Sequence, residues 1–427
     1  MVRFFLFSFL FFAGFKGFSK DKDFLILEIE VLGLERTEKR VALRELTFKA
    51  SERISEKVLQ ESLANIRNTR LFSRVDYSLE DKGMGKKLIL RLKEKWTTIP
   101  IFKVARGGGV QKLTLGVYDV NILGKGFETG AQLERLSKTT SGVIWFKNPR
   151  IFDSATGVDF QLWNINILRT KYYSEPIKPV IYKGFLHIRK KALLRIHHKF
   201  TDMFEASLLL EHHTDDFSYS YAEEKIKKIT EENGGLPEGS QIYYLGLSAS
   251  YGKINYNGHL VSGYKALASY RRARSLERHK NKAFGRYDFE LLYGKTLLGS
   301  ATFAQRILAG STGSDYLQYW YYLGGLDGIR GFQVDRFSGR QYWLSNTELR
   351  SSPYRGDRYL LQGVLFYDAA AVGHEKRDLT KTKATSAGFG VRFMMPDIYR
   401  LVVRLDFAKT LKRYDNRTVN FGLQQFF

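Results

Sequence analysis

The sequence contains no cysteine and only seven prolines in 427 residues. Without cysteine, the chain can form neither disulfide bonds nor a thiolate metal site. A soluble β-sandwich would show more proline-marked loops, so the scarcity of proline disfavours that class. The chain also lacks a Gly-x-Ser-x-Gly elbow and other hydrolase signatures, which argues against a fused esterase and leaves no residue pattern that indicates catalysis.

The first 19 residues have the three parts of a secretory signal peptide. Arg3 supplies a basic n-region, residues 4–15 an apolar core, and Gly17-Phe18-Ser19 a small-x-small cleavage site. We expect the mature chain to begin near Lys20; an uncleaved N-terminal anchor is the alternative. No later stretch is long and apolar enough for a spanning helix, which needs about 20 residues. A mature chain that enters a membrane must therefore do so as a closed β-barrel.

Aromatic residues make up 15% of the chain, and the net charge is +24. A charge of this size is typical of proteins that bind nucleic acid or an anionic surface. Here, however, Lys and Arg recur inside apolar strand-like segments instead of gathering in patches or tails. This distribution indicates a barrel with a polar inner wall and an apolar outer wall, and no nucleic-acid partner. We attribute the basic excess to a solvated lumen; an attraction for acidic clients is the alternative.

Residues 24–96 predict a small α+β domain. A strand-like run over residues 25–32 is followed by two candidate helices, and Thr37 and Ser55 are their candidate N-caps. Apolar residues lie on one face of each helix: Val41 and Leu46 in the first, and Val58, Leu59, Leu63 and Ile66 in the second. Two strands follow at residues 72–80 and 88–94, joined by a turn at residues 81–83. The expected order is strand, helix, helix, strand, strand.

From residue 97 to residue 427 the pattern changes to about sixteen segments with a period of two. An even number of such segments is expected for a bacterial outer-membrane barrel. The clearest segment covers residues 399–407. Its apolar face carries Tyr399, Leu401, Val403, Leu405 and Phe407, and its polar face carries Arg400, Arg404 and Asp406.

The connections between these segments differ in length. Short turns are predicted at residues 121–125, 202–203, 252–255 and 298–299, and long loops at residues 216–240 and 311–340. Residues 221–235 predict a short helix that ends at Asn233-Gly234. Short turns on one side and long loops on the other are typical of transmembrane barrels. On this count, the loop at residues 311–340 is the sixth on the long-loop side.

This loop contains a glycine-rich segment, residues 324–332, with Arg330 as its one cation. Glycine allows the chain to turn back sharply at no steric cost. Residues 366–372 form an apolar strand whose one carboxylate is Asp368. An arginine and a carboxylate so placed can join as a forked, charge-assisted pair; two ordinary solvated charges are the alternative.

Two histidine pairs, His197-His198 and His212-His213, raise the question of a metal site. Neighbouring residues on a strand point to opposite faces, so neither pair can chelate a metal alone. We predict wall residues, no metal site and no cofactor.

The motif Arg330-Gly331-Phe332, followed by residues 346–350 and then Asp368, resembles the BamA/TamA-type superfamily of outer-membrane assembly and secretion barrels. Residues 32–37 and 71–75 resemble a polypeptide-transport-associated (POTRA) domain. Further likenesses lie at residues 121–126, 148–152, 388–393 and 404–408, so that the resemblance covers essentially the whole mature chain. The departures are Ala370, where the family usually has glycine, and the presence of a single POTRA domain.

The resemblance implies a mainly β fold, in which a 16-stranded antiparallel transmembrane β-barrel follows one small α+β POTRA domain. The implied division is a signal peptide at residues 1–19, a POTRA domain at 24–96 and the barrel at 97–427. The sixth loop would fold into the lumen and be locked there by Arg330, Gly331, Phe332, Asp368 and Glu348. Gly422 and Phe427, on the last strand, would mark a seam where the first and last strands pair weakly.

The implied function is the insertion, assembly or translocation of β-rich polypeptides at the bacterial outer membrane, without catalysis. The POTRA domain would lie in the periplasm and receive clients. Expected partners are unfolded outer-membrane or secreted polypeptides, outer-membrane lipid, and periplasmic chaperones or accessory subunits. A dedicated two-partner secretion pore is the alternative, and a passive porin or adhesin is the third candidate, since a porin needs neither a POTRA domain nor an inward loop.

Overall fold

The computed structural model describes residues 23–107, 110–173, 180–276, 283–325, 328–356, 358–380, 384–395, 402–411, 414 and 416–423. The predicted signal peptide, residues 1–19, and the predicted seam residue Phe427 lie outside these ranges, as do Tyr399, Arg400 and Leu401 of the predicted strand at residues 399–407. Within these ranges, no helix has the length and apolarity needed to cross a membrane.

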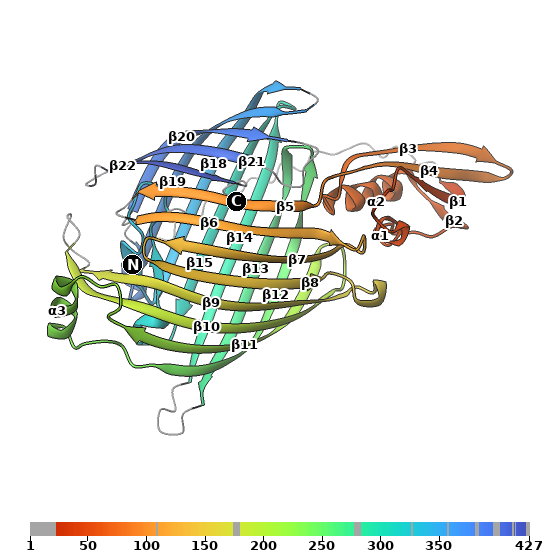
Figure 1. The fold of residues 1–427 in the computed structure, drawn as a ribbon. Helices are drawn as coiled ribbons and strands as arrows, with labels where there is room; N and C mark the ends of the chain where they lie inside the picture. Colours follow the sequence, from red (N-terminus) through yellow and green to blue (C-terminus); the bar gives the residue numbers. More distant parts are fainter. Residues whose placement is uncertain are drawn as a thin grey trace, which may run out of the picture.

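A small α+β unit comes first in the chain and fits a POTRA domain (Figure 1). Its sheet has the strand order β2-β1-β4-β3. The elements are β1 (Phe24–Leu32), α1 (Lys39–Leu43), β2 (Glu52–Ile54), α2 (Glu56–Asn68), β3 (Phe72–Lys82) and β4 (Gly85–Glu94). The predicted order omitted β2, because three residues are too few to show a period. The core is formed by the apolar faces of β1, α2 and β4, with Ile26, Leu59, Leu63, Ile66, Leu88 and Leu90.

The two helix caps differ from each other. Ser55 caps α2 as predicted, because its Oγ accepts a hydrogen bond from the Val58 N–H. Thr37 does not cap α1, which begins after Glu38 without a side-chain cap. Instead, Thr37 Oγ1 accepts a hydrogen bond of 2.9 Å from Asn121 Nδ2 in the barrel. Leu46 lies beyond the end of α1.

Sixteen antiparallel strands form the rest of the fold, which confirms the predicted number. They are β5 (Thr98–Gly107), β6 (Val110–Ile122), β7 (Phe127–Leu136), β8 (Thr139–Asn148), β9 (Thr156–Tyr172), β10 (Ile181–Lys199), β11 (Phe204–Ser218), β12 (Ser240–Asn257), β13 (Leu260–Ser275), β14 (Phe284–Leu297), β15 (Ala301–Thr312), β18 (Gln341–Arg355), β19 (Leu360–Gly373), β20 (Ala384–Met394), β21 (Val402–Thr410) and β22 (Arg417–Leu423). Neighbours in this order are hydrogen-bonded, and the missing numbers belong to two short strands in the loop between β15 and β18.

The two faces of the wall differ as the alternation predicted. On β21, Phe407 is exposed on the outside, whereas Arg404 and Asp406 are buried on the inside. Exposed apolar residues recur on the outer face of other strands, among them Leu115, Leu133, Leu247, Phe289, Leu365 and Phe389. A surface of this extent in contact with water would be unfavourable, so the outer face is suited to lipid.

The connections lie at two ends of the barrel. The turn predicted at residues 252–255 is wrong: β12 continues to Asn257, and the chain turns at Gly258 and His259 instead. Gly252 has a positive φ of 104° within the strand, which explains why it looked like a turn. On the long-loop side, the connection between β7 and β8 is also short, at residues 137–138. The predicted loop helix is confirmed as α3 (Glu224–Glu232), which ends at Asn233.

The α+β unit lies at the short-turn end of the barrel, whereas α3 lies at the opposite end (Figure 1). The α+β unit contacts three successive turns and the end of β12. The Glu38 N–H donates to the Gly124 carbonyl, and Arg150 forms a forked pair with Glu45 at 3.0 and 3.2 Å. Further along α2, Asn65 donates to Asp202 and Asn68 donates to Asn255, both at 3.1 Å. The unit is therefore fixed against the turns of the first half of the barrel.

We predict that the protein fractionates with outer membranes and migrates faster on a detergent gel when it is not heated. Successive strands from β5 to β22 are hydrogen-bonded along the ladder, and a barrel with paired backbone groups resists detergent until heating. Gel mobility before and after boiling measures this. Recovery from the soluble periplasm, with one mobility under both conditions, would contradict the membrane assignment.

Candidate functional site: a loop folded into the barrel

The loop between β15 and β18, called loop 6 here, is the sixth connection on the long-loop side, as predicted. It contains the one-turn helix η2 (Leu317–Tyr319) and a two-stranded ladder of β16 (Tyr321–Leu323) and β17 (Phe337–Gly339). Gly324 and Gly325 form its bend. Gly324 has φ 122°, and a Cβ on it would lie 2.1 Å from the Gln333 carbonyl oxygen. Only glycine fits this position, so the sharp reversal of loop 6 depends on it.

At the tip of loop 6, Arg330 is fully buried and forms a fork with Asp368 of β19. Its Nε and one terminal nitrogen donate to the two oxygens of Asp368, each at 2.8 Å, and its backbone N–H donates to the same carboxylate at 3.2 Å. The other terminal nitrogen donates to Glu348 of β18 at 2.7 Å. The guanidinium also lies over the Phe366 ring, 3.5 Å from the ring centroid. The structure thus brings Arg330, Asp368 and Glu348 together.

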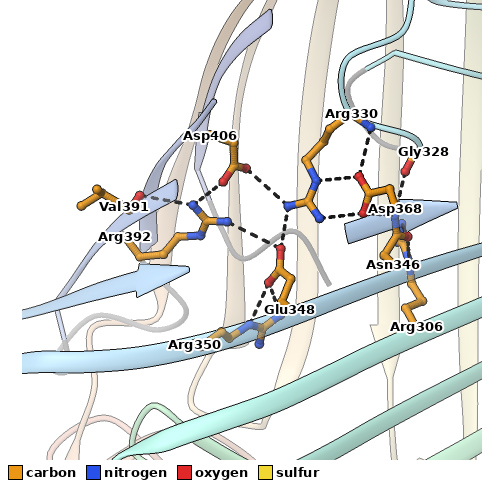
Figure 2. Close-up of polar contacts among 10 residues, drawn as sticks. All are labelled: Arg306, Gly328, Arg330, Asn346, Glu348, Arg350, Asp368, Val391, Arg392 and Asp406. Atoms are coloured by element: carbon orange, nitrogen blue, oxygen red, sulfur yellow. Dashed lines mark hydrogen bonds and ion pairs between the residues drawn. The ribbon is translucent and has the colours of Figure 1, made fainter. Parts of the chain in front are cut away.

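A second layer surrounds this fork (Figure 2). Arg350 pairs with Glu348 at 2.8 Å, and Arg392 of β20 pairs with Asp406 of β21 at 2.6 Å. Asp406 also lies 3.9 Å from Arg330. Three arginines therefore face three carboxylates in this buried cluster, so that each of these buried charges has an opposite charge beside it. Burial disfavours the charged form of Arg330, but the adjacent carboxylates, Asp368 first, raise its pKa above the ordinary value.

Gly331 and Phe332, the other two residues predicted to hold loop 6, contact the wall and the loop through packing. Gly331 has φ 92°, and a Cβ there would lie 3.1 Å from Thr410 Cγ2 on β21. Phe332 is buried and packs edge-on against Phe337 and Tyr414, with ring centroids 5.3 and 5.2 Å away. Ala370 is buried in the same apolar cluster, so its methyl group packs beneath the loop.

Four members of the cluster were not predicted from the sequence: Asn346, Arg350, Arg392 and Asp406. Asn346 donates to Asp368 at 2.9 Å and to the Gly328 carbonyl at 3.0 Å. Residues 346, 348 and 350 alternate along β18 and so point inward together. That alternation was a usable signal for Asn346 and Arg350. Arg392 and Asp406 reach the cluster through the pairing register of other strands, which the sequence alone does not give.

The predicted seam residue Gly422 lies on β22, where a Cβ would approach Arg404 Nε at 3.1 Å. Strands β22 and β5 lie next to each other. Among the described residues, however, the ladder of sixteen strands starts at β22 and ends at β5 and includes no pairing between these two.

A sixteen-stranded barrel with an inward-folded, arginine-locked loop and a POTRA-like unit defines a class, the outer-membrane barrels that insert or secrete proteins. The chain belongs to the Omp85 superfamily, whose domain model matches residues 121–427. Barrels of this superfamily are outer-membrane transport and assembly factors and not enzymes.

Similar solved structures agree on the fold. BamA from Haemophilus ducreyi lacking POTRA domains 1–3 has 16% identity and a TM-score of 0.53, over 94% of this chain and 84% of that chain. CdiB from Acinetobacter baumannii has 14% identity and a TM-score of 0.60, over 94% and 74%. CdiB from Escherichia coli has 12% identity and a TM-score of 0.62, over 93% and 76%. No curated protein sequence matches this chain.

We predict that Arg330→Ala and Asp368→Ala lower the free energy of unfolding by similar amounts and that the double variant is little worse than either. Breaking a buried pair costs on the order of 3–5 kcal/mol, against about 1 kcal/mol for an exposed pair. Urea unfolding in detergent micelles measures these changes.

Arg340→Ala is the matched control, because Arg340 pairs with the exposed Asp315 in the same loop. Its effect should be small. Strictly additive losses for Arg330→Ala and Asp368→Ala would show that these two residues do not act as a unit.

Proposed function

We propose that this protein inserts or assembles β-rich polypeptides at the outer membrane through the seam between its first and last strands. The observation that carries this proposal is the absence of a ladder between β5 and β22 in the described part of the chain, although the two strands are adjacent. A strand edge with unpaired N–H and C=O groups is a template for a further strand. A client strand would add to this edge by β-augmentation.

In this proposal, residues 24–96 form a periplasmic POTRA domain that receives clients, after residues 1–19 have been removed. The domain lies at the short-turn end of the barrel (Figure 1), and short turns of bacterial barrels face the periplasm. Because the unit contacts the turns of the first half of the barrel, it lies close to the start of β5 without covering every turn. Arg330, Gly331, Phe332, Asp368 and Glu348 would hold loop 6 in the lumen, and Gly422 and Phe427 would weaken and end the seam.

A dedicated secretion pore for one exported protein is the second candidate, favoured by the likeness to the two CdiB structures. Depletion of the protein, followed by a census of outer-membrane and secreted proteins, separates the two. We expect a general loss of barrels from the outer membrane. Loss of one secreted chain would support the pore, and an unchanged census would support a passive porin or adhesin.

We predict that a disulfide across the seam stops client assembly until it is reduced. The chain has no native cysteine, so engineered pairs are read without background. The cysteine pairs are placed at exposed positions of the two strands. Phe102 and Val104 are exposed on β5, and Val419 and Phe421 are exposed on β22. Each of the four combinations should be tested, and at least one should have the short Cβ separation that a disulfide needs.

The matched control joins Ser248 and Ser269, which already face each other in the ladder of β12 and β13. A disulfide there should leave assembly unchanged. If a seam pair cross-links fully and clients are still assembled at the normal rate, the seam is not their route.

A further inference from the structure

Loop 6 is anchored at its stem as well as at its tip. Tyr319, in η2, is buried, and its hydroxyl lies 2.9 Å from Asp215 Oδ2 and 2.7 Å from Ser240 Oγ. Asp215 belongs to β11 and Ser240 to β12, so these contacts fix the stem to the wall of the first half of the barrel. They use none of the residues of the Arg330 cluster.

Asp215 is itself fully buried and is held by two neighbours on β10. Arg189 Nε donates to Asp215 Oδ1 at 2.6 Å, and His187 Nε2 lies 2.7 Å from the same oxygen. Arg189 also donates to the Gln318 carbonyl of η2 at 3.0 Å. Arg189 therefore binds both the wall carboxylate and the loop backbone, which orients Asp215 toward Tyr319.

Two more contacts extend this stem anchor along loop 6. The Tyr321 hydroxyl donates to Asp288 of β14 at 2.7 Å. Asp335, after the tip, forms an ion pair with Arg169 of β9 at 2.8 Å. In the ladder of sixteen strands, β9 lies eight strands away from β19, which carries Asp368. The loop thus joins opposite sides of the barrel.

The tip and Tyr319 of the stem belong to separate apolar clusters. The tip packs with Ile329, Phe332, Phe337, Leu344, Ala370 and Tyr414. The stem packs through Tyr319 with Ile242, Tyr244, Ala273 and Phe284. Separate cores with separate polar contacts open as separate units when local stability is lost.

We propose that loop 6 is a strut across the lumen, whose tip anchor and stem anchor release independently, so that loss of the Arg330 cluster alone does not open the lumen. Tyr319, Asp215, Arg189 and Asp335 are the positioning residues of the stem anchor. This property of the barrel holds whether clients pass through the seam or the lumen.

Two buried alanines on the inner wall report on each anchor by cysteine labelling. Ala370→Cys lies under the tip and Ala273→Cys under the stem, and each is labelled with a membrane-impermeant maleimide in detergent micelles. We expect Arg330→Ala to speed the labelling of Ala370→Cys only, and Tyr319→Phe with Asp335→Asn to speed that of Ala273→Cys only. Each rise should be at least about tenfold, because a hydrogen bond to a charged group contributes this much to a local opening equilibrium.

Ion conductance in planar bilayers gives the second readout. We expect it to stay at the level of the unmodified protein for Arg330→Ala and for Tyr319→Phe with Asp335→Asn, and to rise when all three substitutions are combined. Arg340→Ala is the matched control, because Arg340 pairs with the exposed Asp315 in the same loop. It should change neither readout.

Heat-modifiable gel mobility establishes that each variant is folded. If Arg330→Ala does not fold, Arg330→Lys keeps the charge, loses the fork and tests the same anchor. The proposal is overturned if a tip variant speeds the labelling of both cysteines equally, or if it alone gives the conductance of the combined variant. It is also overturned if the combined variant conducts no better than the unmodified protein.

Discussion

A guanidinium buried in a protein must be surrounded by carboxylates, because an unpaired charge there is strongly unfavourable. Arg330 places this requirement in the lumen of the barrel, and four strands are arranged to meet it. Asp368 and Glu348 bind the guanidinium directly, and Asp406 and Arg392 form a further ion pair beside it. The register of β18 through β21 has to bring these residues to one level on the inner wall. The pairing of the C-terminal strands and the position of loop 6 therefore both depend on the same set of charge pairs.

The outer face of the barrel is apolar, in contrast to the charged lumen. There, apolar side chains such as Leu247 and Leu365 are exposed, and lipid is the solvent that suits them. Polar contacts between the α+β unit and the barrel lie at the short-turn end, in turns, as with Glu45 and Arg150, and at the ends of strands, as with Asn68 and Asn255. The molecule has three environments: a charged lumen, an apolar belt and a polar end where the small domain is attached.

Local patterns in the sequence predict much of this. The period of two gives the sixteen strands, and the position of Arg330 in the sixth long loop follows from counting them. Ser55 and α3 were found from caps and turn residues. Strand β2 was not predicted because it is too short to show a period of two, and a turn was wrongly predicted near Gly252, which lies inside β12. Arg392, Asp406 and the contact of Tyr319 with Asp215 were out of reach, because they depend on which residues of distant strands share a level.

The double attachment of loop 6 has a consequence for how the barrel is built. Elsewhere the wall is a succession of hairpins with neighbours close in the chain, so bringing them together has a small entropic cost. The pairing of β15 with β18 has to enclose the whole of loop 6. Since the loop touches β9 on one side and β19 on the other, these contacts can form only when the two halves of the wall face each other across the lumen. Loop 6 therefore cross-links two parts of the wall that lie eight strands apart.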